Sequence, residues 1–270
     1  MTRPFVKWAG GKGQLLTELQ SRMPQEYGAY YEPMVGGGAL FFSLRPANAT
    51  LVDANFDLMR LYRIIRDSPD ALIEDLQTHQ NTKQYFDELR MEDRTPSYDS
   101  WSDVRKASRT LFLNRTCFNG LYRVNKSGQF NVPYGKYVNP YIPTADHLRD
   151  CSAALQGCTI TYNSFGWIES MVEEGDFVYF DPPYLPLSDT AKFTEYTRNG
   201  FGLMEHEALR DLCTRLDARG VRFMLSNACT EATLALYAAW NVEQVAATRS
   251  ISASPVGRAP VQEIIVRNYV

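Results

Sequence analysis

The chain has 270 residues, a formal net charge of −3 at pH 7 and 44% hydrophobic residues, which suits one large globular domain or a core with an inserted subdomain. No stretch resembles a signal peptide, and no apolar run approaches the ~18 residues of a membrane span. The five cysteines include no C-x-x-C pair, so we expect a reduced, cytoplasmic protein without structural disulfides.

Positive charge is concentrated in one interval of this acidic chain. Between Asp103 and Asp146 there is no acidic residue. The cations of this interval are Arg105, Lys106, Arg109, Arg115, Arg123, Lys126 and Lys136. A solvated basic face is the ordinary explanation of a charge run, but the lack of counter-charges here favours contact with a polyanion.

The first element is a glycine-rich turn that leads into a helix. Residues 5–13 read FVKWAGGKG, and apolar residues recur at helical spacing from Leu15 to Met23. Such a turn lets backbone N–H groups approach a ligand closely. The spacing G-x-x-x-x-G-K-[ST] is absent, so nucleotide triphosphate binding is not indicated. Trp8 fits a core position as well as the wall of a ligand site.

A second glycine turn follows a short strand that ends at Glu32. Gly36-Gly37-Gly38 leads into a helix that begins near Ala39, as in the first β-turn-α unit of a doubly wound sheet. The turn lacks the G-x-G-x-x-G spacing of dinucleotide sites.

The next strand, 50–53, ends in an acid. In doubly wound folds an acid at this position binds ribose hydroxyls. The alternative is that Asp53 caps the helix predicted over 55–67. The glycine turn before it favours the ribose interpretation.

Residues from about 56 to 155 leave the alternation of strands and helices. Asn119-Gly120 and Ser127-Gly128 are turn signals that flank short aromatic and basic segments, as in β-hairpins. We therefore predict an inserted subdomain that reads the substrate. Its helical patterns cover 55–67, 70–78, 82–91 and 101–113.

The alternation resumes after residue 157. The run Phe177 to Phe180 is apolar on both faces, as a central parallel strand must be, and Pro182-Pro183 cannot continue it. Asp181 and Tyr184 would then lie at the carboxyl edge of the sheet, where ligands bind, although an ordinary strand-to-loop turn is the alternative. Further strands are predicted over 158–162, 221–227, 241–247 and 261–269, and helices near 166–173, 204–219 and 230–238.

Several predicted strand ends meet at this edge: the glycine turn, Asp53, the Asp181–Tyr184 segment and Ser164-Phe165. A cofactor with a ribose, an aromatic base and a polar tail, but no phosphate, fits such an edge. S-adenosylmethionine has these parts.

The order of motifs resembles the DNA adenine methyltransferase (Dam-like) family, which is the D12 class of N6-adenine methyltransferases with a D-P-P-Y motif in the alpha arrangement. The resemblance covers nearly the whole chain. The shared motifs are Phe5–Gly11 with Lys12, Glu32–Phe42, Asn119-Gly120-Leu121 with Arg123, Phe130–Pro133 and Asp181–Tyr184.

The resemblance implies an α/β, Rossmann-like S-adenosylmethionine-dependent methyltransferase sheet with an inserted, mostly helical plus β-hairpin DNA-recognition domain. We expect the catalytic, cofactor-binding domain at 1–56 and 156–270 and the target-recognition domain at 57–155. The expected partner is double-stranded DNA in the cytoplasm, with a cognate restriction endonuclease as a functional partner. No membrane is expected, because no apolar run is long enough to span one. No metal ion is expected, because the three histidines are scattered.

The resemblance also implies roles for individual residues. Asp181 and the Pro182 carbonyl would hold the target amine, Pro183 would set the turn, and Tyr184 would stack on the flipped base. The implied cofactor-binding residues are Trp8, Gly10, Lys12, Gly36, Gly37, Gly38, Asp53, Ser164, Phe165 and Asp181. The implied DNA-binding residues are Arg115, Asn119, Leu121, Arg123, Lys126 and Pro133.

Within the family, Arg123 corresponds to the arginine that reads a guanine, and the usual site is GATC, methylated at N6 of adenine. Cys117 and Phe118 depart from the glycine and tyrosine common in the family's hairpin, which puts the finer contacts there in doubt.

The alternative functions are those of an N4-cytosine methyltransferase and of a DNA-binding protein with a degenerate catalytic site. A nucleotide-dependent oxidoreductase is disfavoured because the dinucleotide fingerprint is missing.

Overall fold

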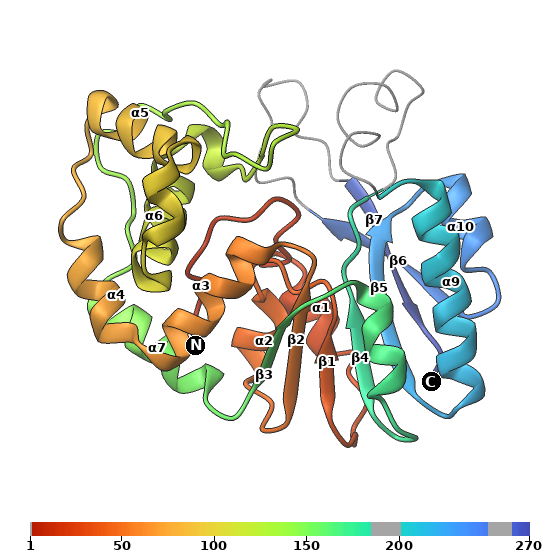
Figure 1. Ribbon diagram of the computed structural model, residues 1–270. Coiled ribbons are helices and arrows are strands. Elements are labelled where there is room, and N and C mark those ends of the chain that lie inside the picture. The colour runs from red at the N-terminus through yellow and green to blue at the C-terminus, as the bar shows by residue number, and fades with distance from the viewer. Residues whose placement is uncertain (1, 185–200, 248–260) are drawn as a thin grey trace. The chain divides into compact units, whose positions relative to one another are not determined.

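The structure is a computed structural model that describes residues 2–184, 201–247 and 261–270 (Figure 1). These residues form two compact units. Unit 1 comprises Met1–Gly11, Gly36–Arg45 and Asn55–Tyr162. Unit 2 comprises Lys12–Val35, Pro46–Ala54 and Asn163–Val270. The domain boundaries expected from the sequence stay a prediction.

The strands confirm the predicted α/β class. Across the described residues they form a seven-stranded sheet with the order β3-β2-β1-β4-β5-β7-β6. β1 pairs with β2 and β4 in parallel, and β4 pairs with β5 in parallel, whereas β7 runs antiparallel to β5 and β6. The strands are β1 (Tyr30–Glu32), β2 (Ala49–Asp53), β3 (Thr159–Tyr162), β4 (Phe177–Phe180), β5 (Arg222–Ala228), β6 (Asn241–Ala247) and β7 (Val261–Arg267).

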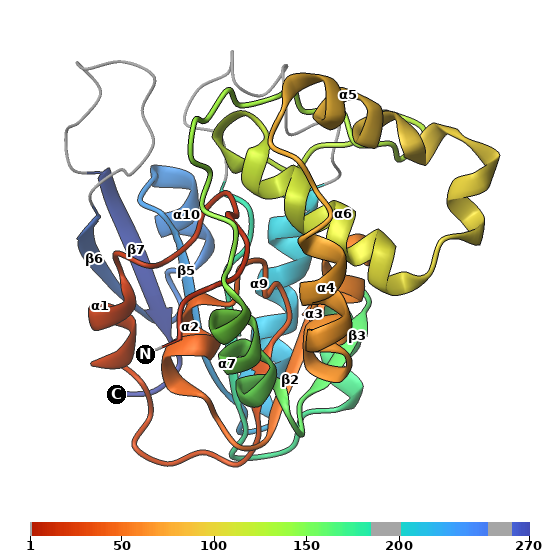
Figure 2. The same ribbon diagram turned by 90° about the vertical axis from the view of Figure 1, so that its left-hand side faces the viewer.

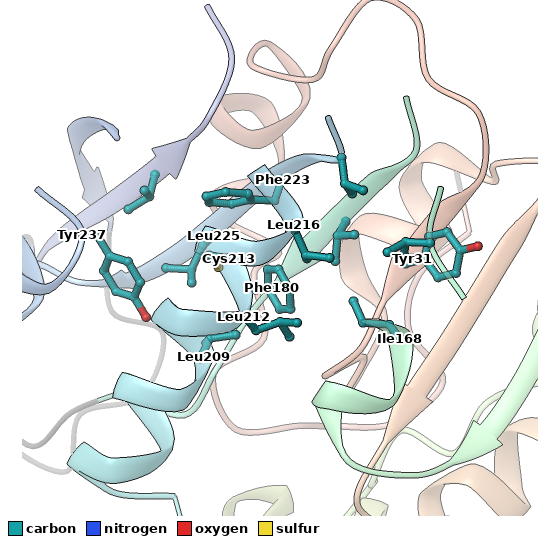
Figure 3. Packing of buried hydrophobic residues seen from close by; sticks show 14 of the residues in the cluster. Tyr31, Ile168, Phe180, Leu209, Leu212, Cys213, Leu216, Phe223, Leu225 and Tyr237 are labelled. Atoms are coloured by element: carbon teal, nitrogen blue, oxygen red, sulfur yellow. The ribbon is translucent and has the colours of Figure 1, made fainter. Parts of the chain in front are cut away.

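The core of unit 2 lies between the sheet and α9 (Leu203–Ala218), which packs along β5 in Figure 1. Figure 3 shows the apolar stripe of α9 against side chains of β4 and β5. The side chains of both the helix and the strands in this contact are almost completely buried. Burial of each such side chain stabilises the fold by about 1.5–3 kcal/mol. The residues in contact are Leu209, Leu212, Cys213 and Leu216 of α9 and Phe180, Phe223 and Leu225 of the strands.

The other helices that the structure describes in unit 2 are short. α1 (Leu16–Gln20) and α10 (Glu231–Leu236) lie within the predicted ranges. The helix predicted near 166–173 is instead the 3₁₀ helix η4 (Phe165–Ser170). Gly166 in its first turn disfavours an α-helix, and the backbone bond from Met171 N to Ile168 O has i→i+3 spacing.

Unit 1 is mostly helical, as predicted for the inserted segment. α6 lies against α3 and α4, and α7 packs on the same two helices (Figure 2). The α-helices are α2 (Ala39–Leu44), α3 (Phe56–Asp67), α4 (Pro69–Leu76), α5 (Lys83–Met91), α6 (Asp103–Thr116) and α7 (Ala145–Leu155). The 3₁₀ helices are η1 (Glu92–Arg94), η2 (Pro96–Ser100) and η3 (Phe118–Gly120).

Side-chain caps fix where these helices begin. The Asn55 side chain accepts a hydrogen bond from Leu58 N and is the N-cap of α3. The alternative in which Asp53 caps this helix is therefore wrong. Thr82, Ser102 and Thr144 cap α5, α6 and α7 in the same way.

The two predicted hairpins differ in outcome. Around Ser127-Gly128 the chain reverses, with an isolated bridge between Val124 and Phe130 and a bond from Asn131 N to Arg123 O. At Asn119-Gly120 the chain forms η3 rather than a hairpin. Both residues have positive φ, so the chain turns within a single tight loop. Next to this loop an isolated antiparallel bridge joins Cys117 to Tyr134.

Candidate active site

The carboxylate that follows β4 is held by two side chains of unit 2. The Lys12 ammonium lies 2.5 Å from Asp181 Oδ1, and the Ser226 hydroxyl donates to the same oxygen at 3.2 Å. The Lys12 side chain is 5% exposed and that of Asp181 19%. Among the described residues, neither a hydrogen bond nor an ion pair reaches Oδ2 of Asp181. The carboxylate is thus fixed through one oxygen while the other remains able to accept.

The sheet register explains why Ser226 reaches this carboxylate. Phe180 pairs with Leu225 in the parallel β4–β5 ladder, so the next residue of each strand, Asp181 and Ser226, also lie side by side. The Tyr179 hydroxyl lies 2.9 Å from the fully buried Ser226 hydroxyl. The sequence alone did not identify Ser226, because its position depends on the pairing of strands 45 residues apart.

Burial raises the pKa of the Asp181 carboxyl, whereas the Lys12 ammonium and the Ser226 hydroxyl oppose that rise. Both groups bind the ionised form and therefore favour it. Removal of either one is expected to raise the pKa of Asp181 further.

Tyr184 is anchored at its hydroxyl, which donates to the Glu263 carboxylate of β7. Lys12 Nζ lies 4.6 Å from the centre of the Tyr184 ring. Burial, followed by the negative charges of Asp181 and Glu263, raises the pKa of the Tyr184 phenol, so it remains a donor at neutral pH. Glu263 was also missed, because it comes from the reversed strand β7, whose first residues lie beside Ala228 at the end of β5.

The other cofactor residues predicted in unit 2 gather at the end of β2. Asn163 N donates to Asp53 O at 3.2 Å, which brings the Asn163–Phe165 segment next to Asp53. Ser164 is exposed, and Phe165 is half-buried with its ring 5.8 Å from that of Phe201. A carboxylate, a hydroxyl and an accessible aromatic ring fit a ribose and an adenine, so this donor set fits S-adenosylmethionine.

In unit 1, the glycine turn is shaped by aromatic side chains of the chain itself. A Cβ on Gly36 would lie 2.8 Å from Trp8 Cδ1, and one on Gly38 would lie 2.6 Å from the Tyr62 hydroxyl. That hydroxyl donates to Gly36 O at 3.0 Å. Both glycines also have positive φ, so a side chain at either position is excluded twice. Trp8 is half-buried beside this turn, and Gly10 is exposed with positive φ.

The Asn119-Gly120 turn is clamped by the buried side chain of Asn114. Its amide donates to Gly120 O at 3.1 Å and to Lys7 O at 2.7 Å, while its carbonyl accepts from Lys7 N at 2.9 Å. The clamp presents Phe118, 51% exposed, and Leu121, 37% exposed, to solvent. In the sequence, Phe118 stands out only as a departure from the family pattern. An aromatic residue beside an Asn-Gly turn is the signal that could have identified it as an exposed residue of this loop.

Arg123 is exposed and oriented by Asn131. Its Nε donates to Asn131 Oδ1 at 2.8 Å, and a terminal nitrogen donates to Asn131 O at 3.3 Å. Lys126 and Pro133 are exposed too, and the Pro133 carbonyl accepts from Phe118 N at 2.8 Å. These three residues are exposed parts of the 118–133 segment of unit 1.

Two of the seven cations in the basic interval face the interior. Arg109 is 3% exposed and lies 2.8 Å from the Asp93 carboxylate, an acid outside the interval. Arg115 donates to the Phe5 and Pro4 carbonyls, and burial lowers its pKa to about 10. The predicted phosphate contact of Arg115 stays a prediction, but its described bonds are structural.

The described residues contain no group of three or more histidine, cysteine or acidic side chains that could hold a metal ion. Within the same residues, none of the helices combines the length and the apolar character needed to cross a membrane.

The sheet and the strand-end carboxylate define an S-adenosylmethionine-type methyltransferase fold, and comparison with known proteins identifies the class. Residues 8–251 match the family described as D12 class N6 adenine-specific DNA methyltransferase. The chain belongs to this family and is an adenine-specific DNA methyltransferase.

Three relatives align along nearly their whole length. The chain is 46% identical to the Type II methyltransferase M1.LlaDCHI of Lactococcus lactis subsp. cremoris, over 99% of this chain and 95% of the relative. It is 36% identical to the Type II methyltransferase M.MjaIII of Methanocaldococcus jannaschii, over 99% of both proteins. It is 35% identical to a DNA adenine methylase of Vibrio cholerae, over 97% of this chain and 95% of the relative.

Proposed function

We propose that the protein transfers the methyl group of S-adenosylmethionine to N6 of adenine in the duplex sequence GATC, and that it flips the adenine out of the helix to do so. The observation that carries the proposal is the asymmetric bonding of Asp181, whose Oδ1 is bound by Lys12 and Ser226. A carboxylate fixed in this way presents Oδ2 in one direction.

An exocyclic amine is a poor nucleophile because its lone pair is delocalised into the ring. Asp181 Oδ2 and the Pro182 carbonyl would accept its two hydrogens, so that the lone pair points at the methyl group. S-adenosylmethionine supplies a methyl group on a positively charged sulfur. The N–C bond would form as the S–C bond breaks with its electron pair left on sulfur. The amine proton in contact with Asp181 would pass to that carboxylate and from there to solvent. Positioning and electrostatics lower the barrier.

Tyr184 would stack on the extruded base. Its hydroxyl is tethered to Glu263 and Lys12 lies over its ring, so we expect the base to use the opposite ring face. Extrusion costs a few kcal/mol, which this stacking and the amine contacts would offset.

The surface around Arg123 would read the DNA. Arg123 can donate to O6 and N7 of a guanine in the major groove, and Asn131 holds it in an orientation that supports such a contact. The exposed Phe118 and Leu121 would act as apolar wedges between base pairs, alongside Asn119. Lys126 would contact phosphate, and Pro133 would line the base edges.

For the cofactor, we propose that Asp53 binds the ribose, that Ser164 and Phe165 flank the adenine, and that Trp8, Gly10, Lys12 and Asp181 lie near the methionine portion. Gly36–Gly38 would allow the backbone to pass close by. The catalytic and recognition domains would be 1–56 with 156–270 and 57–155. A cognate restriction endonuclease in the same cytoplasm is supported by the Type II designation of two relatives.

The test uses a plasmid free of adenine methylation, with isotope-labelled S-adenosylmethionine, base analysis and mapping of the modified positions. We expect N6-methyladenine, and we expect it in GATC. Duplexes with one GATC and with a single changed base pair serve as matched substrates, and 2-aminopurine at the target position reports extrusion by increased fluorescence. Methylated cytosine, or adenine methylation spread over sites other than GATC, would overturn the proposal.

A further inference from the structure

Tyr122 occupies a position for which the proposed reading and transfer reactions give no role. It lies between Leu121 and Arg123, and its ring stacks on Trp8 with a centroid distance of 5.4 Å and an interplanar angle of 29°. Its edge faces Phe130 at 5.8 Å. A single side chain in the DNA-reading segment therefore covers the indole that is expected to form a wall of the cofactor site.

The hydroxyl of Tyr122 is fixed on α3. It donates to Asp57 Oδ2 at 2.8 Å, and the other oxygen of Asp57 accepts from Arg60 at 2.8 Å. Arg60 is also paired with Asp103, in the first turn of α6, at 3.0 Å. Burial and the Asp57 charge raise the pKa of Tyr122, so the phenol keeps its proton. The ring therefore cannot move without breaking a bond to the helical part of unit 1.

Trp8 is also confined by the glycine turn. The Gly36 backbone lies so close to the indole that a Cβ at Gly36 would be 2.8 Å from Trp8 Cδ1. Trp8 thus packs against both the glycine turn and the Tyr122 ring. Because close-packed side chains leave little free volume, a shift of the segment that carries Tyr122 changes the space open to Trp8.

We propose that Tyr122 is a positioning residue that couples reading of the DNA sequence to the cofactor site. This inference rests on the proposed function of Arg123 and Trp8. When Leu121 and Arg123 engage their target sequence, Tyr122 is held in register and fixes Trp8 against the glycine turn. The cognate duplex then strengthens cofactor binding, and by thermodynamic reciprocity the cofactor strengthens binding of the cognate duplex by the same factor.

The coupling factor is the ratio of the cofactor's Kd without DNA to its Kd with DNA, and it can be measured directly. Calorimetry gives the Kd of S-adenosylhomocysteine, which is unreactive, alone and with a saturating GATC duplex or a duplex with one changed base pair. For the wild type we expect the GATC duplex to tighten binding by about 5–150-fold, the usual range of coupling between sites, and the changed duplex to tighten it much less. Equal effects of both duplexes on the wild type would overturn the inference.

Tyr122→Ala removes both the stack on Trp8 and the bond to Asp57, whereas Tyr122→Phe removes the bond alone. We expect the coupling factor to fall close to 1 in Tyr122→Ala and to an intermediate value in Tyr122→Phe. Tyr134→Phe is the matched control, since it loses a comparable phenol bond to Asn81, at 2.9 Å, and should keep the wild-type factor. Thermal unfolding of each variant separates loss of coupling from loss of fold, and Tyr122→Phe preserves the test if Tyr122→Ala does not fold.

Wild-type coupling in both Tyr122 variants, or the same loss in Tyr134→Phe, would overturn the inference. Failure of the proposed function itself would look different, because the wild type would then leave GATC unmethylated in the plasmid assay.

Discussion

The Lys12 ammonium lies 2.5 Å from Asp181 Oδ1, and the two side chains are only 5% and 19% exposed. A buried pair of this kind is sensitive to the loss of one partner, since the remaining charge is left without compensation at a cost of about 3–5 kcal/mol. Lys12 therefore fixes both the position and the charge state of the carboxylate. This relationship makes the pH dependence of the reaction a direct probe of the site.

Substitutions of Lys12 and Ser226 should shift the acidic limb of the pH–rate profile upward. Transfer needs the Asp181 carboxylate, and the pKa of this group is raised by burial and lowered by Lys12 and Ser226. We expect the limb to lie above pH 3.8 in the wild type, higher in Ser226→Ala and highest in Lys12→Met. Initial rates with the GATC duplex between pH 4 and 9 would measure it, and an unchanged limb in both variants would contradict the assignment.

The raised pKa of Asp181 restricts transfer to higher pH but makes the folded state less stable there. The folded protein keeps the Asp181 proton to a higher pH than the unfolded chain does, so folding loses stability from this group as pH rises from 3.8 through the folded pKa. Replacement of Asp181 by Asn should remove this contribution, which denaturant titration at several pH values can detect.

Asp181→Ala should abolish methyl transfer while leaving DNA binding largely intact. Loss of one preorganised contact to the reacting group typically lowers the rate by about 10²–10³. Labelled-methyl incorporation measures the rate, and fluorescence anisotropy with the GATC duplex measures binding. Substantial methylation by this variant would show that the amine is held by another group.

Arg123→Ala should weaken discrimination at one guanine by about 1–3 kcal/mol, the value of a good bidentate contact. Asn131→Ala should cause a smaller loss, since it releases the orientation of Arg123 and leaves the guanidinium in place. Competition among single-base variants of GATC provides the measurement.

The matched control for Arg123 is Lys126→Ala. It should lower affinity for all duplexes alike and reduce the salt-dependence slope by about 0.9, as expected for one lost phosphate contact. An unaltered base preference in Arg123→Ala would remove the arginine from the reading surface.

Gly38→Ala should destabilise the protein more than Gly128→Ala. Both glycines have positive φ, which costs an alanine about 1–2 kcal/mol, but a Cβ on Gly38 would meet the Tyr62 hydroxyl at 2.6 Å while Gly128 faces open space. We expect the overpacking to add about 1–3 kcal/mol at Gly38. Urea unfolding of both variants measures the difference.

Tyr62→Phe provides a rescue test for this clash. Alone it should cost about 1 kcal/mol through its lost bond to Gly36 O. Combined with Gly38→Ala it should cost less than the sum of the two single changes, because the clashing oxygen is gone. Strict additivity would indicate that backbone strain alone determines the cost.

His79 should make unit 1 less stable in acid. Its side chain is 4% exposed and lies 2.7 Å from the Tyr85 hydroxyl and 2.8 Å from that of Ser108. Burial lowers its pKa from 6.5 to about 4, with Asp75 opposing and Arg105 reinforcing the shift. The unfolded chain therefore binds the proton first, and the stability present above pH 6.5 is lost as pH falls toward 4, by about 3 kcal/mol in total.

His79→Gln should keep polar contacts in this place without titrating between pH 4 and 6.5. Its unfolding free energy is expected to vary less over that interval than that of the wild type. Parallel pH profiles for both proteins would contradict the prediction.

The sequence predicted the sheet well because the signals for it are local. The doubly apolar run Phe177 to Phe180 and the two prolines after it placed β4 and the site at its end, and most strand boundaries agree to within two residues. The position of β7 between β5 and β6 has no such local signal, since it depends on which strands pair. Glu263 was missed for that reason.

Charge counting along the chain was less reliable than strand prediction. Arg109 counted as a free cation because its partner Asp93 lies outside the interval between Asp103 and Asp146. Arg115 satisfies backbone carbonyls, a function that sequence patterns do not reveal. A one-dimensional count cannot distinguish a cation that is folded inward from one that faces DNA.

The placement of β7 also sets the order in which this half of the sheet can be completed during synthesis. β7 follows β5 and β6 in the chain, and in the described sheet β6 pairs with β7 alone. Until β7 has been translated, β6 has no described strand to join, β5 has an open edge and Tyr184 lacks Glu263. We therefore expect the outer strands of this half of the sheet, and the anchor of the Tyr184 hydroxyl, to form later in synthesis than the parallel strands before them.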